Sequence, residues 1–161
     1  GNSLVEKSKI KIANTLIKLA KEKKKKIILP IDSVNAKNIT SDCIITSDIY
    51  KIDADLIGLD IGVKSCDIFS KIITDSKTII WNGPMGLFEI DKFENGTKKI
   101  AESICNATKN GAFSIVGGGD SVSAIKKFNY EKNISYISTG GGAMLEYLEG
   151  KVLPGVFAIQ N

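Results

Sequence analysis

Histidine and arginine are both absent from this chain of 161 residues. Without histidine, histidine-dependent catalytic triads and histidine metal sites are excluded. All 22 basic residues are lysine, so the chain cannot form a bidentate guanidinium clamp on a phosphate group. Any phosphate chemistry must therefore use lysine, backbone amides, a metal ion or groups from outside this chain.

Cysteine is scarce, and long hydrophobic runs are missing. The three cysteines, Cys43, Cys66 and Cys105, are scattered and odd in number, which predicts buried thiols in a reducing cytoplasm rather than a disulfide framework or zinc site. No apolar run approaches the length of a membrane span, and the start of the chain lacks a signal-peptide pattern. We therefore expect a cytoplasmic protein with no membrane partner.

The remaining composition is that of an ordinary globular protein. With 43% hydrophobic and 25% charged residues, residues 1–161 are long enough for one domain with a sizeable core. The net charge of +4 is mild, and its densest source is the run of lysines at positions 21 and 23–26. That run ends a predicted helix, which favours a solvated helix terminus over a nucleic-acid-binding patch. We expect no nucleic-acid partner.

Strand and helix patterns alternate along most of the chain. Apolar residues at three- and four-residue intervals predict an amphipathic helix over residues 6–24. Short apolar runs predict a buried strand at 27–31 and a second strand at 43–46. From residue 56 onward the pattern predicts, in order, a strand at 57–62, a helix to 74, a strand at 78–81, a helix at 94–109, a strand at 112–116, a helix at 120–128, a strand at 134–138 and a helix at 142–149. This alternation indicates an α/β fold with a parallel sheet and crossover helices.

Two glycine triplets, at 117–119 and 140–142, each follow an apolar run and precede a predicted helix. Glycine lets backbone N–H groups approach a ligand closely, and a helix N-terminus adds partial positive charge. A third tight turn, at 82–86, follows the strand that ends at Trp81. Because ligands bind beyond the carboxyl ends of parallel strands, all three turns are expected at one phosphate-binding rim.

Two common nucleotide-binding fingerprints are absent. Counted from Gly117 or Gly140, the third glycine of G-x-G-x-x-G would fall on Val122 or Leu145, and the Walker pattern does not occur. A dinucleotide-dependent oxidoreductase is therefore a weak interpretation. A nucleotide, if bound, is held by another glycine arrangement.

Several residues near these turns allow two interpretations. Asp120 is either an N-cap or a Mg²⁺ ligand, and its spacing alone favours the cap; Ser121 would cap or contact phosphate. Glu89 is either a surface carboxylate, which the pattern favours, or a ribose contact. Trp81 is more often core than a cofactor wall, and Gly58 is either a simple turn glycine or a close approach for a flat base.

Long ordered segments of this sequence closely resemble the phosphoglycerate kinase family. The strongest matches are WNGPMGLFE at 81–89, GGGDS at 117–121 and STGGGA at 138–143. The segments GNSLVE at 1–6, GLDIG at 58–62 and LE with LEGKVLPGV at 145–156 agree as well. Because the matches are correctly spaced from the first residue almost to the last, the resemblance is highly specific.

The resemblance implies two Rossmann-like domains, each a parallel sheet with helices on both faces in a three-layer α/β/α arrangement. The family transfers a phosphoryl group reversibly between 1,3-bisphosphoglycerate and MgADP, giving 3-phosphoglycerate and MgATP. Residues 1–161 are similar to most of the C-terminal, nucleotide-binding domain. The glycerate substrate then binds through the missing N-terminal domain, and the full-length protein is expected to be a monomer.

Site residues follow from the resemblance position by position. Gly58 lines the adenine pocket, Asn82 and Pro84 lie along the nucleotide, and Glu89 contacts the ribose hydroxyls. The residues facing the phosphates are Gly118, Gly119, Asp120 and Ser121, with Asp120 holding Mg²⁺. The backbone N–H groups offered to the transferring phosphoryl group are those of Gly119, Gly140 and Gly141. The resemblance thus reverses the pattern-based interpretations of Asp120 and Glu89.

The chain also departs from the family. The catalytic arginine and the basic glycerate site belong to the N-terminal domain, and the glycine- and lysine-rich phosphate loop should precede Gly1. Leu56-Ile57 stands where Trp-Met is usual, and Tyr136 stands where histidine is common. We therefore expect a fragment, a separately expressed domain or a proteolytic product that is inactive alone. The alternative is a non-catalytic binding or structural remnant, whose exposed sheet edge and apolar surface would promote self-association.

Overall fold

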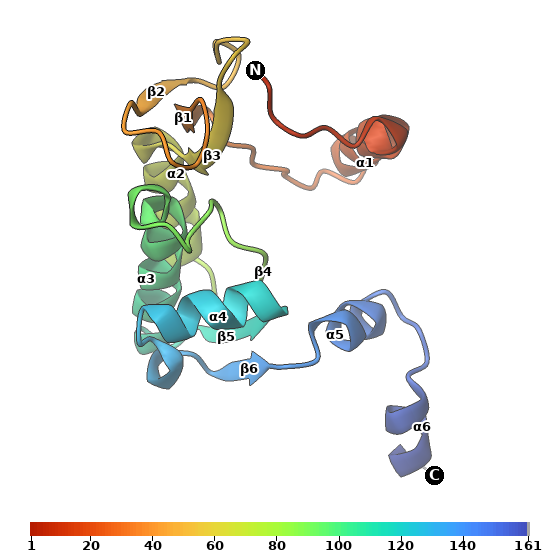
Figure 1. The fold of residues 1–161 in the computed structure, drawn as a ribbon. Helices are drawn as coiled ribbons and strands as arrows, with labels where there is room; N and C mark the ends of the chain where they lie inside the picture. Colours follow the sequence, from red (N-terminus) through yellow and green to blue (C-terminus); the bar gives the residue numbers. More distant parts are fainter. Residues whose placement is uncertain (161) are drawn as a thin grey trace. The chain divides into compact units, whose positions relative to one another are not determined.

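The computed structural model describes residues 1–160, so Asn161, the last residue of the predicted domain, lies outside the described residues. The chain divides into two compact units, residues 1–65 and the residues from 66 onward. Figure 1 shows the elements of both units in chain order.

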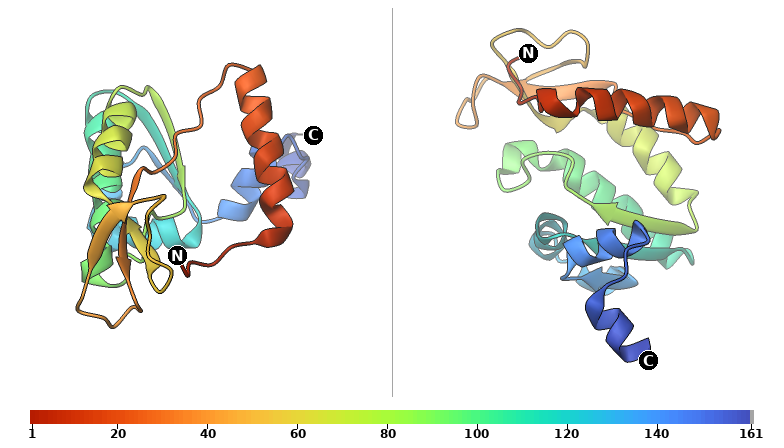
Figure 2. Two further views of the ribbon diagram at one scale, coloured as in Figure 1. Left: turned by 90° about the horizontal axis from the view of Figure 1, so that it is seen from above. Right: turned by 90° about the vertical axis from the view of Figure 1, so that its right-hand side faces the viewer.

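The first unit contains a helix and an antiparallel sheet. Its elements are η1 (Lys7–Lys9), α1 (Ile10–Glu22), β1 (Asp32–Ala36), β2 (Ile45–Asp48) and β3 (Ile57–Ile61). The strands lie in the order β2-β1-β3, and β1 pairs antiparallel with both neighbours. Helix α1 forms where periodicity predicted it, and Figure 2 shows extended segments leading into and out of it. None of its residues is buried.

The second unit is an α/β layer structure around a parallel sheet. Helix α2 (Val63–Thr74) enters it from the first unit; β4 (Thr78–Asn82), η2 (Asp91–Phe93), α3 (Asn95–Lys109), β5 (Phe113–Gly117), α4 (Gly119–Lys127), η3 (Glu131–Asn133), β6 (Tyr136–Ser138), α5 (Gly141–Leu148) and α6 (Pro154–Gln160) follow. The strands lie in the order β4-β5-β6, and both pairs are parallel. Helices α3 and α4 pack against β5 (Figure 1).

The core of the second unit follows the alternating pattern of the predicted strands and the three- to four-residue spacing of the predicted helices. Strand β4 alternates, with Ile79 and Trp81 buried and Ile80 exposed. Helix α3 buries the apolar face that includes Ile100 and Ile104. Trp81 is only 5% exposed, which confirms its interpretation as a core residue. Because parallel strands need crossover connections, these helices necessarily cover the sheet.

The predicted buried strand at 27–31 is wrong. Residues 27–30 have no regular structure, and Ile27, Ile28 and Leu29 are 41–59% exposed. The strand begins instead at Asp32. An apolar run shows only that burial is favourable, whereas a buried strand also needs a hydrogen-bonded neighbour. Within the described part of the first unit, no strand pairs with residues 27–30.

Two further expectations require correction. Strand β3, expected to begin the parallel series, pairs antiparallel with β1, because the order of elements along a chain does not determine which strand pairs with which. Cys43, expected to be buried, is exposed, whereas Cys66 and Cys105 are buried as predicted. Cys43 lies in the connection between β1 and β2, which runs over the surface.

Asp32 caps helix α2 within the first unit. Its carboxylate accepts hydrogen bonds from Lys64 N (3.0 Å), Ser65 N (2.8 Å) and the Ser65 hydroxyl. Burial by itself raises the pKa of Asp32, but the hydrogen bonds from Ser65 and Lys64 outweigh it and hold that pKa below its ordinary value. A Cβ on Gly62 would collide with the Asp32 carboxylate, so glycine is required at this turn.

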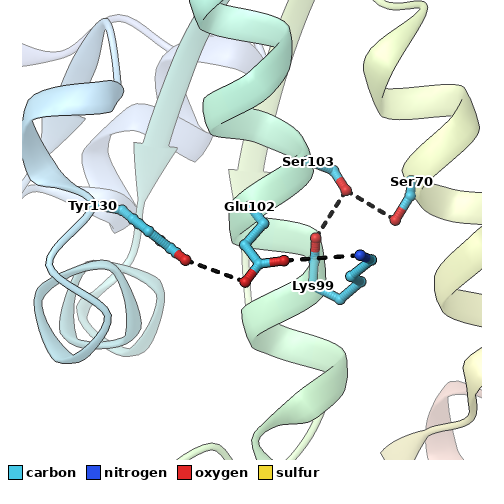
Figure 3. A network of polar contacts seen from close by, with 5 residues as sticks. All are labelled: Ser70, Lys99, Glu102, Ser103 and Tyr130. Carbon is cyan, nitrogen blue, oxygen red and sulfur yellow. Dashed lines mark hydrogen bonds and ion pairs between the residues drawn. The ribbon is translucent and has the colours of Figure 1, made fainter.

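Helix α3 is anchored on both sides by polar contacts (Figure 3). Glu102 accepts a hydrogen bond from the Tyr130 hydroxyl (3.3 Å), and Ser103 shares one of 2.9 Å with Ser70 of α2. Burial raises the pKa of Tyr130, and the charge of Glu102 adds to the effect. Burial, with the same charge, raises the pKa of Cys105 to about 11, so this thiol stays protonated and is a packing residue.

Among the described residues, no helix is both long enough and apolar enough to cross a membrane.

Candidate functional site

The three parallel strands end level with one another. Asn82 at the end of β4 is in register with Gly117 at the end of β5, and Gly117 is in register with Ser138 of β6. The three turns that follow therefore leave the sheet at one edge. This is the carboxyl edge, where ligands of open parallel sheets bind.

The two glycine triplets touch. A Cβ on Gly141 would lie less than 3.0 Å from the backbone nitrogen of Gly118, and a Cβ on Gly117 would collide with the side chain of Met144. Gly118 has φ of +87°, and a Cβ there would lie 3.0 Å from Asn82 Oδ1. These turns therefore meet only because the glycines at these positions have no side chains.

Each triplet opens a helix. Gly118 is the N-cap of α4 and Gly140 the N-cap of α5, and neither has a side-chain capping hydrogen bond. The first intrahelical bonds are Val122 N to Gly118 O and Met144 N to Gly140 O, both 3.0 Å. The backbone N–H groups of both first turns, among them those of Gly119 and Gly141, have no intrahelical acceptor. Two positive helix ends thus meet at one place.

Asp120 lies in the first turn of α4 and is exposed. Its interpretation as the N-cap is wrong, because Gly118 occupies that position. Among the described residues, no group of three His, Cys, Asp or Glu side chains could hold a metal ion. Mg²⁺ typically takes one or two carboxylates together with substrate phosphate oxygens and water, so a single carboxylate beside two helix ends fits such a site.

Ser121 and Trp81 hold the turn after β4. The fully buried Ser121 hydroxyl accepts a hydrogen bond from Gly83 N (2.6 Å), and Trp81 Nε1 donates to Gly83 O (2.7 Å). Gly83 has φ of +109°, a conformation that favours glycine. Ser121 therefore connects α4 to the turn that carries Asn82 and Pro84.

The segment between β4 and α3 carries Pro84 and Glu89. Its first half is fixed by the buried Thr97, whose hydroxyl accepts hydrogen bonds from Met85 N (3.1 Å) and Gly86 N (3.2 Å). Its second half is fixed by the buried ring of Phe88 and by Lys127, which donates to the Phe88 carbonyl at 2.8 Å. Glu89 follows this carbonyl and is exposed.

Sequence reasoning missed Thr97 and Lys127. Nothing in its spacing distinguishes Lys127 from the other lysines, and the only signal for Thr97 was its place in the first turn of a predicted helix. Both residues matter because they contact the segment between β4 and α3, and Lys127 is distant from that segment in the sequence.

An open hollow of about 530 Å³ borders the second triplet. Thr139 and Gly140 form its polar side, and Tyr136, Met144 and Val156 belong to its apolar side. The hollow lies next to the meeting point of the triplets, because Met144 also contacts Gly117. It offers an apolar wall beside the helix ends.

Gly58 lies in the first unit, on β3, opposite Asn35 of β1. A Cβ there would lie 2.9 Å from the Ser33 hydroxyl oxygen, so the absence of a side chain lets Ser33 lie close to this backbone. The predicted role of Gly58 against an adenine ring stays a prediction.

Comparison with known proteins yields one family. The sequence model of the family described as "Phosphoglycerate kinase" matches residues 1–151. The chain is 49% identical to phosphoglycerate kinase of Prochlorococcus marinus (strain NATL2A) and 48% identical to that of Thermosipho africanus (strain TCF52B). Both matches cover 100% of this chain and 40% of the relative.

Solved structures that are similar to this chain are also phosphoglycerate kinases. Phosphoglycerate kinase from Coxiella burnetii matches with a TM-score of 0.88 and 37% identity, covering 94% of this chain and 39% of that one. The enzyme from Pyrococcus horikoshii OT3 matches with a TM-score of 0.79 and 29% identity, covering 96% and 38%. The chain therefore spans about two fifths of the length of these relatives.

Proposed function

Because this chain belongs to the phosphoglycerate kinase family, we propose that it supplies the MgADP/MgATP site of a glycolytic phosphotransferase. The reaction is reversible transfer of a phosphoryl group from 1,3-bisphosphoglycerate to ADP, giving 3-phosphoglycerate and ATP. Residues 1–161 form most of the nucleotide-binding domain in this proposal. In this proposal, the glycerate substrate binds to a part that corresponds to the portion of the relatives not covered by this chain.

The contact between Gly141 and the backbone of Gly118 carries the proposal. It brings two helix N-termini and the end of β4 to one edge of the sheet, within reach of a single polyphosphate. A phosphate bound there would receive backbone N–H bonds and two favourable helix dipoles. No arginine is needed for that.

The roles proposed for the site residues are those that membership of the family implies. Asn82 and Pro84 lie along the nucleotide, Glu89 accepts hydrogen bonds from the ribose, and Gly58 lies against adenine. The residues proposed to face the phosphates are Gly118, Gly119, Asp120 and Ser121. Ser121 does so from a buried position, where it also fixes Gly83.

The chemistry asked of these residues is positioning and charge stabilisation. The N–H groups of Gly119, Gly140 and Gly141 are donors fixed by the fold, so they need no reorganisation when charge spreads over the transferring phosphoryl oxygens. Asp120 would hold Mg²⁺, which neutralises phosphate charge when bound.

Calorimetric titration of the chain with MgADP tests the proposal. We expect Asp120→Ala to weaken binding by about 10- to 100-fold, the worth of a charge-assisted contact. Asp75→Ala, a change of an exposed aspartate after α2, should leave the affinity unchanged. With ADP and a chelator, the unaltered chain and Asp120→Ala should bind equally weakly. Equal affinities for MgADP would exclude the metal role, and no binding by the unaltered chain would exclude the nucleotide site.

A further inference from the structure

The segment from Gly83 to Glu94 has only short turns and η2 as regular structure. It is held by turn bonds such as Phe88 N to Gly86 O (2.9 Å) and Ile90 N to Leu87 O (3.1 Å). Its near end is tied to Ser121 through Gly83, as described above. Turns of this kind do not fix a position by themselves, so the place of Glu89 depends on what holds the far end.

Lys127 holds that far end together with the buried rings of Phe88 and Phe93. Its ammonium group lies 2.7 Å from Glu94 Oε2 and 3.0 Å from Asp91 Oδ1, and it donates to the Phe88 carbonyl at 2.8 Å. A lysine ammonium has three protons, so all of them are directed at one segment. The three acceptors flank Glu89 on both sides.

The strength of the three contacts differs. The side chains of Lys127 and Glu94 are 33% and 18% exposed, whereas that of Asp91 is 92% exposed. Hydrogen bonds to Glu94 and Asp91 raise the pKa of Lys127, so it remains charged at neutral pH. The Glu94 and Phe88 contacts therefore carry the anchoring, because an exposed ion pair contributes little.

Lys127 lies on α4, the same helix whose first turn belongs to the phosphate-binding end of the proposed site. Asp120 is in the first turn of α4 and Lys127 in its last, about 10 Å further along the axis. A helix of this length is rigid, so Lys127 fixes Glu89 at a set distance from Gly119 and Asp120. One helix then sets the spacing between the phosphate-binding and ribose-binding groups.

We propose that Lys127 is a positioning residue for ribose recognition, acting through the Phe88–Glu94 segment on Glu89. This rests on the proposed nucleotide site and adds a determinant of its specificity. Lys127 does not contact the nucleotide. It sets where the Glu89 carboxylate lies.

The test compares the affinities of the full chain for MgADP and for magnesium 2′,3′-dideoxy-ADP, which lacks both ribose hydroxyls. The unaltered chain should prefer MgADP by about tenfold or more, the worth of hydrogen bonds to a charged group. Lys127→Met should bring this ratio close to one while changing the affinity for the dideoxy nucleotide less than twofold. Lys127→Arg should restore most of the preference, and Lys126→Met, the neighbouring exposed lysine, should leave it unchanged.

Two further variants make the outcome decisive. Glu89→Gln should lower the ratio, and adding Lys127→Met to it should lower it no further, since both act through one carboxylate. Glu94→Gln keeps Lys127 in place and should lower the ratio partly, even if Lys127→Met fails to fold. A full preference for MgADP in both folded Lys127→Met and Glu94→Gln would overturn the positioning role alone. Absence of MgADP binding by the unaltered chain would overturn the proposed function and this inference together.

Discussion

At Gly141 one missing methyl group decides whether the two glycine turns can meet. Gly141 and Gly142 are neighbours in the same helix, and from sequence they are equivalent. Their surroundings differ completely, because a Cβ on Gly141 would collide with the Gly118 backbone whereas one on Gly142 meets nothing within 4 Å. Substitutions at Gly141 and Gly142 therefore distinguish the effect of close backbone approach from the effect of glycine flexibility.

We expect Gly141→Ala to lower the free energy of unfolding by about 1–3 kcal/mol, because backbone atoms must shift to accommodate the new Cβ. Gly142→Ala should leave it unchanged or raise it by up to about 1 kcal/mol, since alanine is the better helix former. Urea unfolding of the two variants beside the unaltered chain measures both. Equal effects of the two substitutions would contradict the observed contact.

At this scale the sequence predicted the glycine turns and the core position of Trp81, but not the backbone geometry of the turns. The positions of Gly118, Asp120 and Trp81 followed from pattern and resemblance. That Gly118 rather than Asp120 caps α4, and that Ser121 is fully buried, depends on the geometry of a turn with φ of +87°. Spacing along a chain does not determine backbone torsion angles.

At the scale of elements, α2 shows how one side chain from another element fixes a helix. Asp32 lies on β1, 31 residues before Val63, where the helix it caps begins, and accepts two backbone N–H bonds from Lys64 and Ser65. Cap residues usually come from the turn just before the helix. The residues just before α2 in the sequence therefore gave no indication that Asp32 caps it.

Replacing this carboxylate should destabilise the first unit. We expect Asp32→Ala to lower the free energy of unfolding by about 1–3 kcal/mol, because it leaves the backbone N–H groups of Lys64 and Ser65 without their acceptor. Asp53→Ala, at an exposed position of the same unit, is the matched control and should change little.

The pH dependence of this difference has a definite sign. The folded pKa of Asp32 lies below the ordinary value of 3.8, so the folded state binds fewer protons than the unfolded state. The stabilisation is complete above pH 3.8 and is lost as the pH falls from there through the folded pKa. Denaturant unfolding of both chains at decreasing pH should show the gap between them shrinking in that window. A gap that widens on acidification would contradict the capping role.

Strand and helix periodicity predicted most elements of the second unit to within a residue or two. It failed at residues 27–31, where the apolar run is exposed, and it did not predict α6. Apolar character indicates only that a segment would gain from burial. Whether a partner covers it depends on the rest of the fold.

At the scale of the whole molecule, the chain exposes many large apolar side chains. Leu16 and Ile17 of α1 are 54% and 51% exposed, and Phe113 and Tyr136 of the parallel sheet are 52% and 59% exposed. Such surfaces promote association.

We therefore expect light scattering to give a mass above the 17.4 kDa of one chain, rising with concentration. The double variant Leu16→Lys/Ile17→Lys should lower that mass toward one chain. Asn14→Lys/Thr15→Lys adds the same charge at adjacent positions and serves as the control. Equal masses for the two double variants would show that the apolar side of α1 does not drive association.

The sequence by itself determined the family, the α/β succession of the second unit and the identity of the glycine turns, because these depend on residue type and spacing. The tertiary structure alone decided that the two triplets touch, that Asp32 caps α2 and that Lys127 anchors the segment carrying Glu89. Those are contacts between residues distant in the chain, and they arise only when packing brings separate elements together.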